Sequence, residues 1–311
     1  METITLKQTE DQLKAFLSSS SKPLLAVVGP TASGKTSLAV QLAKEFNGEV
    51  INADSRQVYK EIVIGNALTT EEEQEGVPHH LFSCTPLSHP FNVSEYKEKA
   101  DALIADIQSR GKLPILCGGT FLWTDAVIDN FVIPPGKPSM ERRDELEKLD
   151  VDTLLEQLAQ VDPESADHLR AAKNKRYIIR ALEIYEQTGQ KKSDIAQKAE
   201  RQYDVYKIAP QWDREVLYDR INKRTSHQLD SGLVKEVQGI INRHAGGNPD
   251  ILLELAWPSV TSIGCKEVVP HIKGEVTREQ LLEKLQQVNR NYAKRQLTWL
   301  RKDEEVKWMK G

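Results

Sequence analysis

Residues 22–117 repeat a pattern in which a short apolar run is followed by a segment with helical spacing. Residues 24–28 form such a run, and residues 35–46 have the composition of a helix. Further apolar runs cover residues 49–52 and 114–117, and Ser94 lies where it can cap a helix between them. Strands that alternate with helices predict an α/β fold with a mostly parallel sheet, whose ligands bind at the carboxyl ends of its strands.

The pattern changes at Ile133, where a proline-rich segment precedes a highly charged stretch of helical character that runs to about Ala199. An apolar run over residues 205–209 predicts a return to the sheet, and amphipathic helices fill most of the remaining chain. We therefore expect an α/β core domain formed by residues 1–132 and 200–311, and an all-helical insertion domain formed by residues 133–199.

The last long helix begins at a capping box, because Thr277 precedes Gln280 by three residues. On a helical wheel, large apolar side chains share one face and basic side chains lie on the opposite face. The apolar face consists of Leu281, Leu285, Val288, Tyr292 and Trp299, and the basic face consists of Arg290, Lys294 and Arg301. We expect the first face to pack against the protein and the second to meet solvent or phosphate.

Composition describes an ordinary globular protein. Of the 311 residues, 39% are hydrophobic and 28% are charged, and no apolar stretch approaches the roughly 18 residues of a membrane span. The polar N-terminus lacks the apolar segment of a secretory signal, so the sequence predicts a cytoplasmic protein with no membrane partner. Cys84, Cys117 and Cys265 lie far apart and form no CxxC pair, so we expect buried thiols rather than disulfides or a zinc site.

Positive charge is concentrated in one stretch of a chain whose formal net charge is −4. Basic residues outnumber acidic ones between residues 170 and 192, within the predicted helical insertion. A charge run of this kind is most often a solvated helical face, and the functional alternative is a surface that binds a polyanion such as RNA.

The segment between the first strand and its helix matches the phosphate-loop pattern GxxxxGK[ST] in full. Its residues are Gly29, Pro30, Thr31, Ala32, Ser33, Gly34, Lys35 and Thr36. Backbone amides, the start of the helix and the Lys35 ammonium present positive charge to a polyphosphate, and the Thr36 hydroxyl can join the coordination shell of Mg²⁺. The motif predicts diphosphate chemistry, with ATP or GTP as the default ligand.

The strand over 114–117 is followed by Gly118-Gly119-Thr120 and not by an acidic residue. The chain therefore lacks the acid after a strand that nucleotide hydrolases usually have, which argues against that class of enzyme. The nearest acid after a strand is Asp54, beside the phosphate loop. Its carboxylate can act as a general base, as a magnesium ligand or, without any chemical role, as a helix N-cap. The position alone does not decide between these roles.

Six segments in order give the chain a wider resemblance. They are Gly-Pro-Thr-Ala-Ser-Gly-Lys-Thr (29–36), Asp-Ser-x-Gln-Val-Tyr (54–59), Pro-His-His (78–80), Gly-Gly-Thr (118–120), Arg-Ala-Leu-Glu (180–183) and Ala-Lys-Arg-Gln-Leu-Thr-Trp-Leu-Arg (293–301). With these segments the chain resembles the tRNA dimethylallyltransferase family, also called isopentenylpyrophosphate transferases, from about Leu24 to Trp308.

The resemblance implies a P-loop-type α/β core with a helical insertion that grips the tRNA anticodon stem-loop. It implies that dimethylallyl diphosphate, rather than ATP, occupies the phosphate loop together with Mg²⁺. The dimethylallyl group would pass to N6 of adenine 37, on the 3′ side of the anticodon, in tRNAs that read codons beginning with U. A monomer is expected.

The resemblance also implies roles for individual residues. Asp54 would be the general base, and Thr31, Lys35 and Thr120 would complete the catalytic set. The residues expected to contact tRNA are Asp54, Ser55, Arg56, Gln57, Thr120, Arg143, Arg176 and Arg180. The chain departs from the family's pattern at Arg56, at residues 171–174 and at Cys265.

Three other functions are compatible with parts of the sequence. A P-loop kinase for a small molecule would use the same loop, Mg²⁺ and an acid, but it has no use for a basic insertion. A prenyltransferase that modifies free AMP shares that objection. An RNA-binding module with a vestigial phosphate loop conflicts with the intact Gly34, Lys35, Thr36 and Asp54.

Overall fold

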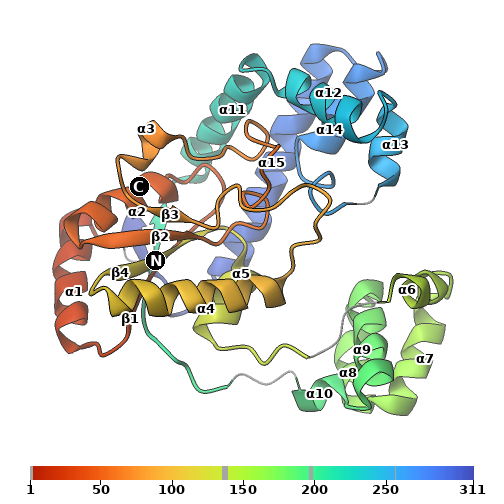
Figure 1. Ribbon diagram of the computed structural model, residues 1–311, viewed down its shortest axis with the longest axis horizontal. Helices are drawn as coiled ribbons and strands as arrows, with labels where there is room; N and C mark the ends of the chain where they lie inside the picture. The colour runs from red at the N-terminus through yellow and green to blue at the C-terminus, as the bar shows by residue number, and fades with distance from the viewer. Residues whose placement is uncertain (1–2, 135–138, 196–198, 256) are drawn as a thin grey trace. The chain divides into compact units, whose positions relative to one another are not determined.

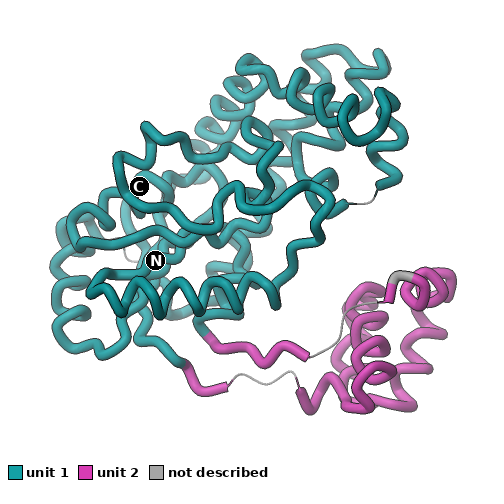
Figure 2. The backbone as a smooth tube through the Cα atoms, in the orientation of Figure 1, with its two compact units in different colours: residues 1–128, 202–311 teal, residues 129–201 magenta. Residues whose placement is uncertain are grey.

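The chain consists of two compact units (Figure 2). The computed structural model describes residues 3–134, 139–195, 199–255 and 257–311. The core unit comprises residues 1–128 and 202–311, and the helical unit comprises residues 129–201. The domain boundaries predicted at 133 and 199 fall just inside the helical unit, and residues 135–138 of the predicted proline-rich junction lie outside the described residues.

The core unit is built on a six-stranded sheet with the order β3-β2-β4-β1-β5-β6, in which every neighbouring pair is parallel. The strands are β1 (Pro23–Val28), β2 (Gly48–Asn52), β3 (His79–His80), β4 (Leu113–Gly118), β5 (Asp204–Gln211) and β6 (Lys307–Lys310). The predicted α/β class and parallel sheet are confirmed. Because all strands run the same way, the loops that follow β1, β2 and β4 leave the sheet at one edge.

Helices cover both faces of this sheet (Figure 1). Leu25 and Val27 of β1 pack with α1 (Leu6–Ser19) and α2 (Lys35–Glu45) on one face. Leu24, Ala26 and Val28 point to the other face, against α4 (Val93–Ser109), α5 (Phe121–Ile128) and the C-terminal helices. Alternate residues of one buried strand therefore serve two cores, which explains its continuous apolar run.

The remaining helices of the core unit are α3 (Glu71–Gln74), α11 (Arg214–Asp230), α12 (Leu233–His244), α13 (Pro249–Glu254), α14 (Cys265–Ile272) and α15 (Arg278–Leu300). The capping box predicted for the last helix is confirmed: Thr277 accepts a hydrogen bond from the backbone of Gln280, whose side chain accepts one from the backbone of Thr277. The cap predicted for α4 is wrong by two residues. Asn92 is the N-cap, and its side chain accepts hydrogen bonds from the amides of Ser94 and Glu95.

Two predictions about burial are also wrong. The buried stripe of α15 runs through Leu281, Leu285, Asn289, Ala293, Gln296 and Leu300. Trp299 lies one position beside this stripe and is 54% exposed, with its indole nitrogen hydrogen-bonded to Asp125. Of the three cysteines, Cys117 and Cys265 are buried but Cys84 is exposed.

The helical unit contains α6 (Met140–Glu147), α7 (Val151–Val161), α8 (Pro163–Arg170), α9 (Lys175–Thr188) and α10 (Lys192–Ile195). Its own apolar core is formed largely by leucine and isoleucine side chains of α7 and α9. Asp162 precedes α8 and accepts hydrogen bonds from the backbone of Ser165 and from the hydroxyl of Ser193, which joins α8 to α10. None of the helices in the described part of the chain combines the length and apolar composition that crossing a bilayer requires.

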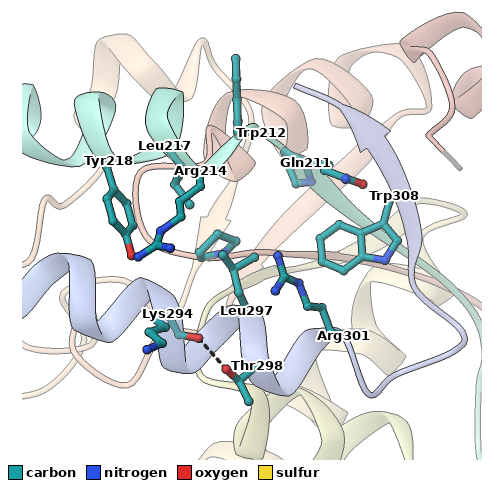
Figure 3. A pocket seen from close by; sticks show the side chains of 12 residues that line it. Gln211, Trp212, Arg214, Leu217, Tyr218, Lys294, Leu297, Thr298, Arg301 and Trp308 are labelled. Carbon is teal, nitrogen blue, oxygen red and sulfur yellow. Dashed lines mark hydrogen bonds between the residues drawn. The ribbon is translucent and has the colours of Figure 1, made fainter. Parts of the chain in front are cut away.

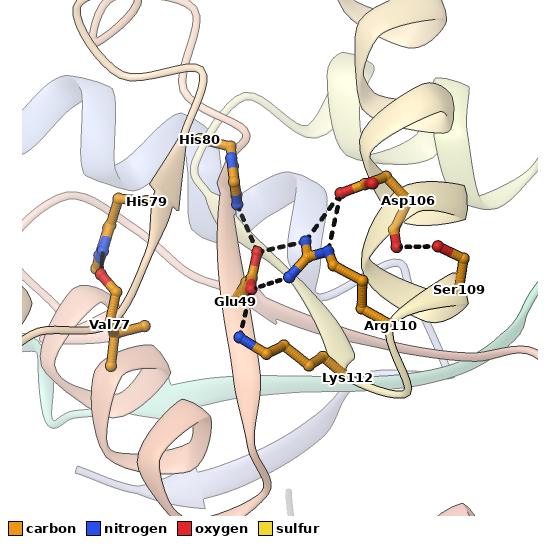
Figure 4. A network of polar contacts seen from close by, with 8 residues as sticks. All are labelled: Glu49, Val77, His79, His80, Asp106, Ser109, Arg110 and Lys112. Atoms are coloured by element: carbon orange, nitrogen blue, oxygen red, sulfur yellow. Dashed lines mark hydrogen bonds and ion pairs between the residues drawn. The ribbon is translucent and has the colours of Figure 1, made fainter.

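Glu49 of β2 is the buried centre of a polar cluster (Figure 4). Its side chain is 3% exposed and accepts hydrogen bonds from Arg110 (Nη2 to Oε2, 2.8 Å), Lys112 (2.7 Å) and His80 (2.8 Å). Arg110 in turn is bonded to Asp106. These contacts, that of Arg110 above all, hold the pKa of Glu49 well below its ordinary value of 4.5.

Glu49→Gln should lower the free energy of unfolding by about 1–3 kcal/mol at neutral pH, because hydrogen bonds from cations to a carboxylate are lost. Because the pKa of Glu49 is lower in the folded protein than in the unfolded chain, its stabilisation is present above pH 4.5. The stabilisation is lost as pH falls through the folded pKa, so the difference between the two proteins should shrink in acid. Urea unfolding of both proteins at several pH values measures this difference in the free energy of unfolding.

Glu45→Gln is the matched control, because Glu45 is half-exposed and meets Lys14 at 3.4 Å on the surface. Equal stability of wild type and Glu49→Gln at neutral pH would contradict a stabilising role for this cluster.

Candidate active site

The loops after β2 and β4 are tied together at the carboxyl edge of the sheet. The amide of Ala53 donates to the carbonyl of Cys117 (2.8 Å), and the amide of Thr120 donates to the carbonyl of Ala53 (3.1 Å). A Cβ atom at Gly118 would lie 2.1 Å from the backbone of Ala53, so this close approach requires glycine. The contact places Thr120 beside the turn that contains Asp54.

The phosphate loop links β1 to α2. Gly34 at the start of the helix and Ala32 have left-handed backbone conformations, with φ of 87° and 61°. Lys35 reaches back to the carbonyl of Pro30 (3.3 Å), and burial lowers the pKa of its ammonium although Asp54 opposes this effect. The first amides of α2 have no partner within the helix. The loop therefore combines unpaired donors with a desolvated cation, as an anion-binding site requires.

Two arginines of α11, which the sequence analysis did not single out, complete this loop. Arg220 Nε donates to the carbonyl of Ala32 (2.9 Å), and Arg224 Nη2 donates to the hydroxyl of Thr31 (2.5 Å). Burial lowers the pKa of Arg224, an effect that Asp54 opposes, and its Nε is buried without a hydrogen-bond partner among the described residues. A buried cation with an unused donor favours an anionic ligand at this place.

A sequence signal for these arginines exists. They are four residues apart, so they share one face of a helix, and the buried Leu217 and Ile221 recur at the same interval. What the sequence lacks is any sign that this helix packs on the phosphate loop.

Asp54 lies in a turn and not at the start of a helix, so its interpretation as a helix N-cap is wrong. Its Oδ1 accepts a hydrogen bond from the amide of Arg56 (2.9 Å), and its own amide donates to the side chain of Asn52 (2.8 Å). No hydrogen bond engages Oδ2 within the described part of the chain. The carboxylate is thus oriented through one oxygen while the other remains available, and a negative charge here also contributes to the raised pKa of Tyr292, whose main cause is burial.

The other residues of this turn hold the surrounding backbone. The amide of Ser55 donates to the hydroxyl of Thr120 (2.9 Å), which donates to the Ser55 hydroxyl (3.2 Å). The guanidinium of Arg56 donates to the carbonyl of Pro258. The side-chain amide of Gln57 donates to the carbonyls of Asn66 (3.1 Å) and Ala67 (3.0 Å). Gln57 therefore has a structural role in addition to any contact with a ligand.

Gln296 of α15 connects the two halves of the site. It is 4% exposed, its Oε1 accepts from the amide of Thr31 (2.8 Å), and its Nε2 donates to the carbonyl of Gly119 (2.9 Å). One buried side chain thus fixes the phosphate loop relative to the loop that carries Thr120. The sequence analysis did not identify Gln296, because a lone glutamine in an amphipathic helix gives no signal.

Oxygen donors suited to Mg²⁺ are present at the phosphate loop. The Ser33 hydroxyl is buried without a hydrogen-bond partner among the described residues, Thr36 lies in the first turn of α2, and the Asp54 carboxylate interacts with Lys35. Mg²⁺ is commonly held by one or two protein oxygens together with phosphate oxygens. These residues fit a magnesium ion that binds together with a diphosphate, with Thr36 as the predicted ligand.

The predicted arginines of the helical unit differ in their surroundings. Arg143 forms a bidentate pair with Glu183 (2.9 and 2.8 Å), which is 1% exposed, and Arg180 approaches the same carboxylate at 3.4 Å. Arg176 is exposed, and so is its neighbour Tyr177 at 54%. Glu183 therefore orients two of the cations, while Arg176 extends from the surface of α9.

Comparisons with known proteins show what this chain resembles. The family model described as IPP transferase matches residues 57–303. A tRNA dimethylallyltransferase of Bacillus cereus (strain AH187) is 41% identical over 288 residues, which cover 91% of this chain and 88% of the relative.

Solved structures are similar to this chain as well. The full-length tRNA isopentenylpyrophosphate transferase of Bacillus halodurans is 39% identical, with a TM-score of 0.68 over 93% of this chain and 90% of that one. A eukaryotic dimethylallyltransferase captured while acting on tRNA is 30% identical, with a TM-score of 0.79 over 90% of this chain and 70% of that one.

Gln296→Met should lower the free energy of unfolding by about 1–3 kcal/mol for each group that loses its partner, the Thr31 amide and the Gly119 carbonyl. The phosphate loop is then no longer fixed, so the binding of inorganic diphosphate should weaken by roughly tenfold, or about 1.4 kcal/mol. Calorimetric titration measures the binding, and chemical unfolding measures the accompanying loss of stability. Gln238→Met is the matched control, since the side chain of Gln238 on α12 donates to Asn242 at the surface, far from the phosphate loop in the sequence. Unchanged binding and stability would show that the bridge has no role.

Proposed function

This chain belongs to the IPP transferase family, and we propose that it transfers a dimethylallyl group from dimethylallyl diphosphate to N6 of adenine 37, on the 3′ side of the anticodon. The acceptors are tRNAs that read codons beginning with U, and the products are the N6-dimethylallyl adenine and diphosphate. The observation that carries the proposal is the meeting of two partly buried, desolvated cations, Lys35 and Arg224, with an oriented carboxylate, Asp54.

The cations account for the departure of diphosphate. An allylic C–O bond breaks readily because the positive charge that develops on carbon is delocalised, so stabilising the leaving group is the main task. Lys35, Arg224 and the amides of the phosphate loop are donors in a poorly hydrated place, where electrostatic stabilisation is stronger than in water. The Thr31 hydroxyl keeps Arg224 in position. Mg²⁺ held by Thr36 would neutralise further charge on the diphosphate.

Asp54 accounts for the activation of the acceptor. The N6 amine is a poor nucleophile because its lone pair is conjugated with the adenine ring. As N6 bonds to the allylic carbon and the C–O bond to diphosphate breaks, the amine must lose one proton. Oδ2 of Asp54 is available to accept it, while Oδ1 is held by the amide of Arg56. Thr120 is hydrogen-bonded to Ser55, which lies in the same turn as Asp54, and would position the adenine.

We propose that the anticodon stem-loop contacts both units. Ser55, Arg56 and Gln57 surround Asp54 and would meet the flipped adenine, because a base must leave the stack to reach such a site. Arg143, Arg176 and Arg180 would contact phosphates, with Arg143 and Arg180 pre-oriented by Glu183. We propose that the protein does this as a monomer in the cytoplasm.

The direct test is incubation of the protein with Mg²⁺, labelled dimethylallyl diphosphate and unmodified tRNA with adenine 3′ of the anticodon. Label should appear in tRNA and not in AMP, and ATP should not be consumed. Consumption of ATP without labelled tRNA would indicate a small-molecule kinase, and label in AMP would indicate an AMP prenyltransferase.

Asp54→Asn should reduce turnover by at least about 100-fold, because positioned general bases contribute about 10²–10⁴-fold. Binding of dimethylallyl diphosphate should not weaken, since a negative charge near Lys35 is removed. Single-turnover transfer and equilibrium binding separate the two effects. Asp11→Asn serves as the control, because Asp11 is an exposed aspartate of α1 that pairs with Lys7 at the surface. Full activity of Asp54→Asn would exclude Asp54 as the base.

Arg176→Ala should weaken tRNA binding and lower the slope of log K against log salt by about 0.7–0.9, the value for one phosphate contact. The fold should be unaffected because Arg176 is exposed. Filter binding between low and moderate salt measures both quantities. Lys235→Ala removes an exposed charge from the core unit as a control. An unchanged slope would remove Arg176 from the tRNA-binding surface.

A further inference from the structure

A second concave site lies on the core unit, beside the phosphate loop (Figure 3). It is a pocket of about 180 Å³ between the end of β5, the start of α11, the C-terminal part of α15 and β6. Pro30 of the phosphate loop forms part of its wall. The reaction proposed above involves none of its polar side chains.

The charged side chains that line this pocket are all positive. Arg214 of α11 and Arg301 at the end of α15 extend toward its centre from different sides, and Lys294 lies at its edge (Figure 3). None of the 12 lining residues is acidic. Among the described residues, no ion pair engages any of these three cations, whereas Arg110, Lys112 and Arg143 all have carboxylate partners.

Apart from Gln211 and Thr298, the rest of the lining is apolar or aromatic. Trp212, Trp308 and Leu297 form much of it, and the guanidinium of Arg214 lies 5.1 Å from the ring centre of Tyr218. Arg214, Lys294 and Arg301 are exposed, so their attraction for an anion rests on three like charges around one hollow. The volume is below the roughly 300–1,000 Å³ of typical drug-sized ligand sites, which favours a small phosphorylated compound over a nucleotide.

We propose that this pocket is a second binding site for a diphosphate group, next to the site in the phosphate loop. The inference rests on the proposed function, in which a diphosphate arrives as the allylic ester and leaves as the inorganic ion. Both carry the same charged group, and Pro30 lies against both sites. No bond is made or broken in the pocket. Its role is to hold the diphosphate before it enters, or after it leaves, the phosphate loop.

Calorimetric titration with inorganic diphosphate and Mg²⁺ tests this proposal. Wild type should bind two equivalents. Lys35→Ala should weaken the site in the phosphate loop and leave the second one. Arg214→Gln with Arg301→Gln should weaken the second site by at least about tenfold and leave the first, because two charged donors are lost. Lys235→Gln with Lys284→Gln removes two exposed charges elsewhere in the core unit and should change neither site.

An unreactive thio analogue of dimethylallyl diphosphate distinguishes the two sources. Tighter binding of the analogue than of inorganic diphosphate at the second site would assign the pocket to the substrate, since the apolar wall then contributes. Equal or weaker binding would assign it to the product.

Two results would overturn the proposal. One is a single diphosphate site that Lys35→Ala abolishes and the arginine changes do not affect. The other is unchanged diphosphate binding in the arginine variant together with weaker, less salt-dependent tRNA binding, which would make the pocket part of an RNA surface. A failure of the proposed function would give a different result: the wild-type protein would transfer no label to tRNA.

Discussion

The close contact between Gly118 and the backbone of Ala53 is the constraint on which the site depends. It exists because β2 and β4 are parallel neighbours, so that their carboxyl ends reach the same edge of the sheet. A side chain at position 118 would force these ends apart. With glycine there, the amide of Thr120 reaches Ala53, its hydroxyl reaches Ser55, and Asp54 is held between them. Gln296 then joins this assembly to the phosphate loop through two buried hydrogen bonds.

The two ends of β2 show opposite electrostatic arrangements. At its start, the buried Glu49 meets Arg110, Lys112 and His80, so its charge is fully compensated and the cluster is a structural one. Beyond its end, Lys35 and Arg224 are desolvated, and among the described residues Asp54 is the carboxylate that interacts with both of them. Positive charge that is only partly compensated costs stability in the free protein, and a bound diphosphate would compensate the remaining charge. The same distinction separates Arg143 of the helical unit, which is paired with Glu183, from Arg214 and Arg301, which form no ion pair with a residue that the structure describes.

Local pattern was sufficient for much of the fold. The apolar runs, the phosphate-loop motif and the capping box at Thr277 each depend on residues close together in the sequence, and the structure has the corresponding strands, loop and helix. The errors arose where neighbours in space decide. Trp299 lies on the apolar side of the helical wheel but beside the stripe that packs against the protein. Cys84 was expected to be buried, as most free thiols are, but it is exposed. The cap of α4 is a local error: Asn92 precedes Ser94 by two residues and accepts hydrogen bonds from the amides of Ser94 and Glu95.

The sequence by itself determined that this chain has a phosphate loop, a parallel sheet and an acid at the carboxyl end of a strand, because each is specified by short-range chemistry and periodicity. Only the tertiary structure decided which distant groups complete the site. Arg224 and Gln296 contact Thr31 across 193 and 265 residues of sequence, and nothing in their local surroundings shows that their helices pack on the phosphate loop. Contacts of this range are set by how α11 and α15 pack on the sheet, and packing depends on the whole core.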